Sequence, residues 1–379
     1  MDQASVRAAT RSRIVAEPGC PIGISSPAHG RSTSAGLAAL AFLFAWAILA
    51  TNPLAAQLAG LARQQPALVI GELDGSDEQV LGHIRGVAVD GAGNLFVLDA
   101  HAHEVRWFGE GGAFRGRPGR RGRGPGERTA PMDIALDGAG RVHVLDPANL
   151  RITTYTPRDT GLVHTGDVRV PPGYSLCAIG ARRFLLLPRD EGVIHEVAAV
   201  GNVVRPFGSI ESPPEETTDR ELRQNPIQRE IVNGGVLRCD PASGTLVLLH
   251  TPLPLVRAFA ADGRPLWRTV LSGYRPIRWI WSPTEDGRPG ARMGVDPATG
   301  TAHTGAALAI TDDGRIIATL SETGYGVEPR LEARVLRLSD GKEIERATVP
   351  IQIAALRGGA VYGHVREPFP RVPVYRSAR

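Results

Sequence analysis

Two stretches of this chain follow one template. Residues 84–109 read IRGVAVDGAGNLFVLDAHAHEVRWFG, and residues 132–157 read MDIALDGAGRVHVLDPANLRITTYTP. The offset between them is constant at 47 residues, so that Val87 corresponds to Ile134. In both stretches, short apolar segments alternate with turns that carry Gly, Asp or Asn. A repeat of this length, built from short strands and such turns, is typical of β-propeller blades.

The remaining chain predicts an all-β fold with six such blades. Degenerate copies of the template begin near Cys177, Val236, Ala307 and Ile353. The last copy has only three strands before the chain ends, whereas an isolated strand at 67–73 precedes the first blade. We therefore expect residues 67–73 to supply the missing outer strand and to close the ring, which leaves no free sheet edge.

Two segments depart from the template. Residues 209–233 are polar and contain helix-forming residues after a Pro-Pro pair, so we expect an inserted loop with a helical turn or two. Residues 274–304 form a second insertion that carries Trp279 and Trp281 in an irregular aromatic loop. This loop either caps the channel mouth, binds a partner or packs on the side of the propeller, and the sequence leaves these alternatives open.

Residues 1–56 are interpreted as a targeting segment. Several Arg residues precede an apolar run of 15 residues at 36–50, and Ala56 ends a small-residue cleavage site before Gln57. The run is shorter than the roughly 20 residues of an ordinary membrane span, so a cleaved signal peptide is favoured over a membrane anchor. The prediction is an exported propeller domain at 57–379, periplasmic or extracellular, which is membrane-anchored only if residues 36–50 are retained.

The exported chain keeps two cysteines, Cys177 and Cys239. On the template, Cys177 aligns with Val87 and Cys239 with Val89, which places them about 6–7 Å out of step along neighbouring first strands. A disulfide needs Cα atoms within about 7 Å. The first strands of neighbouring blades also belong to separate sheets, which adds lateral distance. We therefore expect two buried thiols rather than a bridge.

Composition and charge exclude a nucleic-acid partner. The chain has 379 residues and a net charge of +4, which is too small to indicate a polyanion as partner. A run of Arg residues lies at 115–128, but no aromatic side chains for base stacking are interleaved with them. Export also separates the protein from nucleic acid. The 45 Gly and 30 Pro residues suit a fold with many tight turns.

The motif GVAVD-GAGNLFVLD is followed by GRGPGE at 122–127 and then by MDIALD-GAGRVHVLD. These residues resemble NHL-type repeats, and especially those of bacterial exported six-bladed β-propeller proteins, whose blades are often joined by a GxGPGEF-like linker. Arg128 stands here where that linker usually has an aromatic residue. The resemblance implies the fold and an exported location. The family includes lyases, lactonase-like hydrolases, sensors and binding scaffolds, so no single activity is implied.

Most polar residues of the template are interpreted as structural. Asp recurs at the ends of strands, where it accepts backbone N–H bonds in turns, and catalytic residues should break a repeat rather than follow it. His101 and His103 are a weak candidate for a metal site, because two His at this spacing face one side of a strand. His103, however, aligns with Leu150 at a hairpin tip, and no third ligand repeats the spacing. No metal or other cofactor is predicted, and His143 and His250 are expected to be structural.

Residues that break the template are better candidates for function. Arg85 and Asp133 lie just before first strands, a position that in propellers opens onto one mouth of the central channel. Arg238 lies within a first strand and is expected to face the channel. Channel-lining ion pairs are the alternative interpretation of these three residues. Trp279 and Trp281 are the candidates in the second insertion.

The predicted function is a scaffold that binds a ligand or a protein on the face that carries the two insertions. This prediction rests on the absence of any evident catalytic constellation in the sequence. The alternative is a metal-dependent hydrolase or lyase with its site at the channel mouth, which requires three or more acids, Asn or His to converge on the axis. The sequence does not identify the partner, whether a protein or a small molecule.

Overall fold

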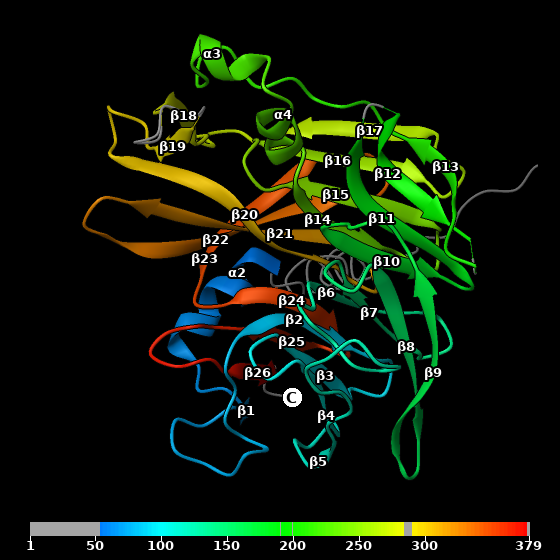
Figure 1. Cartoon of the computed structure of the whole chain (residues 1–379). Helices are drawn as coiled ribbons and strands as arrows, with labels where there is room; N and C mark the ends of the chain where they lie inside the picture. The colour runs from blue at the N-terminus through cyan, green and yellow to red at the C-terminus, as the bar shows by residue number, and fades with distance from the viewer. Residues whose placement is uncertain (1–53, 190, 199, 284–289, 377–379) are drawn as a thin grey trace, which may run out of the picture. The chain divides into compact units, whose positions relative to one another are not determined.

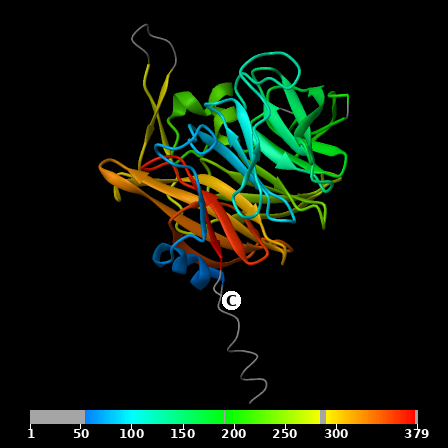
Figure 2. The same ribbon diagram turned by 90° about the horizontal axis from the view of Figure 1, so that it is seen from below.

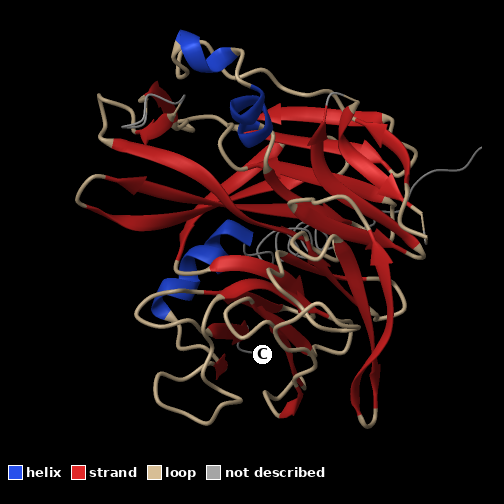
Figure 3. Cartoon of the chain, viewed as in Figure 1, coloured by secondary structure: helices blue, strands red, loops and turns tan. Residues whose placement is uncertain are grey.

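The computed structural model describes residues 54–189, 191–198, 200–283 and 290–376, all within one unit that spans Asn52–Arg379. These residues form six four-stranded sheets and one two-stranded sheet, and strands dominate (Figure 3). The predicted all-β, six-bladed propeller is therefore confirmed, with one four-stranded sheet for each blade (Figure 1). The apolar run at 36–50 lies outside the described residues. Within the described ranges, no helix has the length and apolar character needed to cross a membrane.

The first three blades follow one another directly along the chain. Blade one consists of β2 (Ile84–Val89), β3 (Leu95–Asp99), β4 (Glu104–Phe108) and β5 (Phe114–Gly116). Blade two consists of β6 (Asp133–Leu136), β7 (Val142–Asp146), β8 (Arg151–Arg158) and β9 (Gly161–Arg169). Blade three consists of β10 (Ser175–Ile179), β11 (Arg182–Arg189), β12 (Gly192–Val197) and β13 (Val203–Phe207).

One insertion lies between blades three and four, and the other lies between blades four and five. The first insertion holds α3 (Arg220–Arg223) and α4 (Pro226–Val232), and the second holds the hairpin β18 (Arg278–Trp281) and β19 (Ala291–Gly294). Blade four consists of β14 (Gly235–Cys239), β15 (Thr245–His250), β16 (Leu255–Ala260) and β17 (Pro265–Val270). Blade five consists of β20 (Thr301–Ile310), β21 (Arg315–Gly324), β22 (Val327–Arg337) and β23 (Glu343–Val349). Blade six contains β24 (Gln352–Arg357), β25 (Ala360–His364) and β26 (Val372–Arg376).

An N-terminal strand supplies the fourth strand of blade six. β1 (Leu68–Ile70) pairs antiparallel with β26, with Leu68 opposite Val374 and Ile70 opposite Val372. This is the pairing that the sequence predicted for the isolated strand at 67–73. Because the two strands come from opposite ends of the described chain, the pairing ties both ends into one sheet.

The first strand of each blade lies at the axis, and each sheet is covered on both faces by its neighbours. β2, β6, β10, β14, β20 and β24 contact one another in succession, and β24 contacts β2 again. The core lies between the blades. Phe96 and Leu98 of blade one, for example, pack with Ile134 and Val144 of blade two. Burial on both faces explains why second strands such as β3 are apolar without alternation.

The recurring Asp residues accept hydrogen bonds from backbone N–H groups, as the template predicted. Asp99 Oδ2 accepts a hydrogen bond from Gly82 N at 2.8 Å. Asp146 Oδ2 accepts the equivalent bond from Thr129 N at 2.7 Å, with both donor and acceptor shifted by the same 47 residues. Asp90 accepts two backbone N–H bonds in its own turn. These carboxylates replace backbone partners that turns cannot provide.

Arg128 takes the place of the aromatic residue that the resembled linker usually has. Its side chain is fully buried, with the guanidinium 4.8 Å from the ring centroid of Tyr155. It donates a hydrogen bond to His103 O at 2.9 Å. Gly119, at φ +107°, leaves room for it, since a Cβ there would lie 1.9 Å from Arg128 Nη1. The planar guanidinium therefore stacks as a ring would and also satisfies a buried carbonyl.

Cys177 and Cys239 form a disulfide with Cα atoms 5.6 Å apart, so the expectation of two buried thiols is wrong. The template alignment failed because blade three turns later than blade one. Pairing in the first hairpin of blade three continues through Ile179, whereas in blade one it ends at Val89. Cys177 therefore lies level with Cys239 instead of two residues away. The contact between β10 and β14 at the axis removes the expected lateral gap.

The helix α2 (Leu54–Gly60) packs against blades five and six (Figure 2), and the 3-10 turn η1 (Leu61–Arg63) follows it. The helix begins three residues before Gln57, the first residue of the predicted propeller domain. Leu54, Leu58 and Leu61 are each at most 2% exposed and belong to one cluster with Ile351. The segment beside the predicted cleavage site is thus part of the propeller core.

Leu58→Ala is expected to lower the free energy of unfolding by about 2–5 kcal/mol, because it opens a cavity between α2 and the sheets. Chemical denaturation followed by circular dichroism measures the change. Leu73 is 64% exposed, so Leu73→Ala is the matched control, with a change below about 0.5 kcal/mol. Equal losses in the two variants would contradict the packing of α2.

Replacing both bridging cysteines by Ser is expected to lower the free energy of unfolding by about 4 kcal/mol, because the bridge joins residues separated by 62 positions in the sequence. Peptide mapping provides a direct check. After alkylation of denatured, unreduced protein, neither Cys177 nor Cys239 should carry the alkyl group. Alkylation of both cysteines would show that the bridge is absent.

Candidate functional site

The six first strands surround a central channel that contains two cavities. One cavity, of about 460 Å³, lies where the first strands enter their turns, at Asp90 and Asp240, and is called the turn-side cavity here. The other, of about 390 Å³, is lined by Arg85 and by Glu230 of α4, and is called the α4-side cavity. Arg238 lines both cavities, so they meet at this residue.

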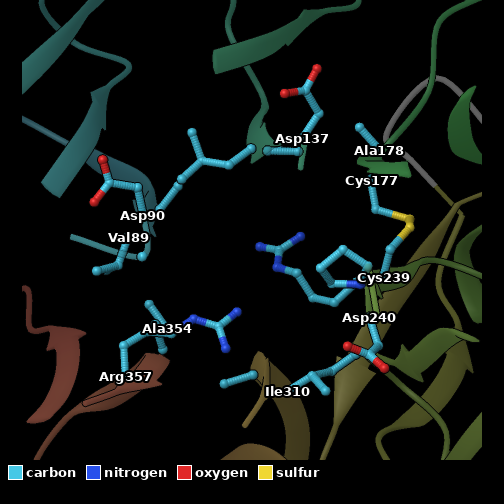
Figure 4. Close-up of a pocket in the computed structure, with 18 of the residues that line it drawn as sticks. Val89, Asp90, Asp137, Cys177, Ala178, Cys239, Asp240, Ile310, Ala354 and Arg357 are labelled. Carbon is cyan, nitrogen blue, oxygen red and sulfur yellow. A yellow bond between two sulfur atoms is a disulfide. The ribbon is translucent and has the colours of Figure 1, made fainter. Parts of the chain in front are cut away.

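The carboxylates of the turn-side cavity serve the turns. Figure 4 shows Asp90, Asp137 and Asp240 around its wall, the disulfide on one side, and Arg357 reaching toward the middle. Each of the three Asp residues accepts a backbone N–H bond within its own turn. Arg357 pairs with Asp312 on the neighbouring blade. The chemical groups of this cavity are therefore largely engaged with one another.

A buried carboxylate, Asp133, joins three blades beside the α4-side cavity. Asp133 is 5% exposed, and its Oδ2 accepts hydrogen bonds from Leu176 N at 2.9 Å and from the Ser175 hydroxyl at 2.5 Å. Arg238 of blade four donates to the same oxygen at 3.0 Å. Ser175 Oγ in turn accepts a bond from Leu237 N at 3.0 Å. Two predicted candidates, Asp133 and Arg238, are thus brought together as a channel-lining ion pair.

The third channel candidate, Arg85, lies at the open end of the α4-side cavity together with Arg366. Both side chains are exposed, and they come from blades one and six. Arg85 Nη2 donates to Met132 Sδ at 2.9 Å. Neither guanidinium forms an ion pair with a carboxylate of the described residues. This mouth therefore carries two positive charges that no described residue pairs with.

The opposite side of the same mouth carries an acid. Tyr174, which precedes β10 of blade three, donates from its hydroxyl to Glu230 Oε1 of α4 at 2.6 Å. Burial and this hydrogen bond raise the pKa of Tyr174 to about 12, so the hydroxyl stays protonated. In a ring of six blades, blade three lies opposite blade six. Arg366 and Glu230 therefore face each other across the opening.

His364 lines the α4-side cavity without adding charge to it. The residue is 6% exposed, and burial together with the charges of Arg366 and His83 lowers the pKa of His364 to about 4. The imidazole is therefore neutral at pH 7. The positive charge of the mouth comes from arginine alone.

The two insertions pack against each other, and among the described residues it is the first insertion that lines the channel. Trp279 N donates to Thr217 O at 2.7 Å, and Asp219 N donates to Trp279 O at 2.9 Å. Trp279 is 8% exposed and packs with Leu222, and Trp281 lies partly buried against the same cluster. Neither tryptophan is among the residues that line the two channel cavities. The described part of this loop packs against the other insertion, an arrangement that the sequence alternatives did not include.

The His101 and His103 pair lies in a hairpin tip, as the alignment with Leu150 predicted. His103 and Leu150 both adopt left-handed backbone conformations, with φ of 59° and 53°, at equivalent positions. His143 and His250 are buried, at 1% and 0% exposure. In the part of the chain that the structure describes, no group of three or more His, Cys, Asp or Glu side chains is placed to hold a metal ion.

Sequence reasoning missed Tyr174, Glu230 and Arg366 as residues of the mouth. Tyr174 lies just before a first strand, and Arg85 was selected as a candidate for this kind of position. Applying that criterion to every blade would also have selected Tyr174. Glu230 lies within the insertion at 209–233, for which the sequence predicts a loop with a helical turn or two but no particular functional residue. Arg366 follows a second strand, and no local pattern indicates that this position faces the channel.

No family model and no curated protein matches this chain. Among solved structures, it is similar to a member of the DUF4221 family from Bacteroides vulgatus, with a TM-score of 0.53 and 10% identity over 83% of this chain and 98% of the other. A putative exported protein from Bacteroides fragilis matches with a TM-score of 0.48 and 9% identity over 80% of this chain and 86% of that one. A streptogramin B lyase has a TM-score of 0.41 and 9% identity over 78% and 83%, respectively. At these identities the similarity shows the β-propeller fold alone.

Arg238→Met is expected to lower the free energy of unfolding by about 3 kcal/mol, because it leaves the buried Asp133 carboxylate without its counter-ion. Denaturant titration measures this change. Arg85→Met, which removes an exposed arginine at the same mouth, is the control, with an expected change below about 0.5 kcal/mol. A similar small change in both variants would show that the Asp133–Arg238 pair does not stabilise the channel.

Proposed function

We propose that this protein is a binding propeller whose α4-side cavity takes a small molecule that carries carboxylate groups. The observation that carries the proposal is the pair Arg85 and Arg366, two exposed guanidinium groups with no carboxylate partner in the described part of the chain. Guanidinium groups bind carboxylates through paired N–H bonds in a fixed geometry. The cavity volume of about 390 Å³ lies within the range of about 300–1,000 Å³ that is usual for small-molecule sites.

The charges around the mouth favour a ligand with two unlike ends. Arg85 and Arg366 attract carboxylates on one side, whereas Glu230 on the other side repels them. The Glu230 carboxylate accepts one side-chain hydrogen bond from the described residues, from Tyr174, and it has further lone pairs for a ligand hydroxyl or ammonium group. We infer that the ligand presents carboxylates toward blades one and six and a hydrogen-bond donor toward α4.

The wall beneath the mouth is rigid enough to favour binding without rearrangement. Asp133, Ser175 and Arg238 join blades two, three and four through hydrogen bonds. The disulfide between Cys177 and Cys239 adds a covalent link between two of these blades. A preformed cavity loses little conformational entropy when a ligand enters, which leaves more of the interaction energy for affinity.

We also propose that the protein acts outside the cytoplasm and resembles NHL-type propellers in this respect. The disulfide supports this location, because such bonds persist in oxidising compartments. Residues 36–50 serve in this proposal as a signal peptide or membrane anchor. Edman sequencing of the protein isolated from its native host distinguishes the two, since a cleaved signal removes these residues.

Isothermal titration calorimetry with citrate, succinate and uncharged succinamide tests the proposed ligand class. The carboxylates are expected to bind, and succinamide is not. Replacing Arg85 and Arg366 together by Gln is expected to weaken carboxylate binding by roughly tenfold or more, since each charge-assisted hydrogen bond contributes about 1.5–3 kcal/mol. Added salt should weaken the binding by the wild-type protein, because both guanidinium groups are exposed.

Arg264→Gln is the matched control, because Arg264 is an exposed arginine in a hairpin turn of blade four, away from the channel cavities. This variant is expected to bind carboxylates as the wild type does. Two results oppose the proposal: unchanged affinity in the double variant, or failure of every carboxylate in the panel to bind at millimolar concentration.

A further inference from the structure

A second polar cavity lies outside the channel, between blades two and three. It has a volume of about 670 Å³ and is bordered by β8 and β9, by the turn between β6 and β7, and by β11. We call it the Arg183 groove. Its charged lining residues are Arg141, Arg158, Asp167 and Arg183. None of the residues singled out in the sequence lies in this groove.

Arg183 is a buried cation without a side-chain partner among the described residues. The residue is 8% exposed, and its Nε is buried with no hydrogen-bond acceptor among the described residues. No carboxylate of those residues forms an ion pair with it. Burial and the nearby charge of Arg141 lower the pKa of Arg183, and guanidinium groups nevertheless stay protonated at neutral pH. A buried charge left in this state is costly unless something else neutralises it.

The neighbouring acid is already engaged. Asp137 accepts a hydrogen bond from Arg141 Nε at 2.7 Å, and His143 Nε2 lies 3.0 Å from the same carboxylate oxygen. Burial alone would raise the pKa of Asp137, but the hydrogen bonds from His143 and Arg141 outweigh it and lower the pKa to about 2. Asp137 is therefore hydrogen-bonded to Arg141 and His143, and it attracts Arg183 without forming a hydrogen bond or ion pair with it.

The remaining charges of the groove are positive in balance. Arg158 is exposed and forms no ion pair with a described carboxylate. Asp167 is the only acid among the lining residues, and it lies 3.1 Å from His164 Nε2 and 3.9 Å from Arg151 Nη1. Two arginines, Arg183 and Arg158, thus have no ion-pair partner in the described part of the chain, and the cavity that they line is open to solvent.

We propose that the Arg183 groove binds a tetrahedral oxyanion, phosphate or sulfate, either as the free ion or as the terminal group of an ester. Arg183 and Arg158 supply charge-assisted N–H donors. A tetrahedral group presents oxygens in several directions, so it can accept hydrogen bonds from arginines of the two blades that line the groove. The site is separate from the channel and does not rest on the function proposed for it.

Calorimetric titration of the full chain with inorganic phosphate tests the site, with acetate as the planar comparison. Phosphate is expected to bind the wild type, and Arg183→Gln is expected to weaken phosphate binding by roughly tenfold or more. Acetate is expected to bind more weakly than phosphate. Glycerol phosphate separates the two sources: tighter binding than inorganic phosphate assigns the groove to an ester, and weaker binding assigns it to the free ion.

Two controls keep the result specific to the groove. Arg264→Gln is expected to bind phosphate as the wild type does, and the titrations are repeated in a protein in which Arg85 and Arg366 are both replaced by Gln, which removes the channel mouth as a second anion site. Circular dichroism checks the fold of Arg183→Gln, and if that variant is unfolded, the exposed Arg158→Gln replaces it with the same expected loss. Phosphate binding that is unchanged in the folded groove variant, or absent in the wild type, overturns the proposal.

Discussion

Asp133 carries a negative charge at the axis of the ring, and the residue is only 5% exposed. Burial of a carboxylate costs several kcal/mol unless donors surround it. Here they come from blade two itself, through Ile134 N at 2.9 Å, from blade three through Leu176 N and Ser175, and from blade four through Arg238. No continuous sheet joins neighbouring blades, so this carboxylate, the hydrogen bond between Ser175 and Leu237 and the adjacent disulfide connect the inner strands of blades two, three and four.

The channel uses one type of side chain, arginine, for two purposes. Arg238 is neutralised by Asp133 and is part of the wall. Arg85 and Arg366, at the α4-side opening, have no carboxylate partner in the described residues and remain available. A guanidinium that is paired and partly buried stabilises the fold, whereas one that is exposed and unpaired contributes little to stability and can bind a ligand. The distinction therefore depends on partners rather than on residue type or position in the repeat.

The blade count, the turn roles of Asp99 and Asp146, and the channel position of Arg238 could be predicted, because each depends on the local pattern of one repeat. The disulfide could not, because the level of Cys177 depends on how far the hairpin of blade three extends before it turns. The contribution of Glu230 depends on how an insertion folds over the channel, which no repeat specifies. The burial of α2 could not be predicted, because its apolar residues cannot be distinguished by composition from the apolar segment that precedes them.

A crystal of the protein soaked in iodide tests the central claim most directly. Iodide is an anion that anomalous scattering locates, so it reports which arginines of the channel lack a counter-ion. The account predicts an iodide peak beside Arg85 and Arg366 in the α4-side cavity, with Arg238 still bonded to Asp133. An iodide beside Arg238 with Asp133 turned away, and none at the mouth, would contradict it.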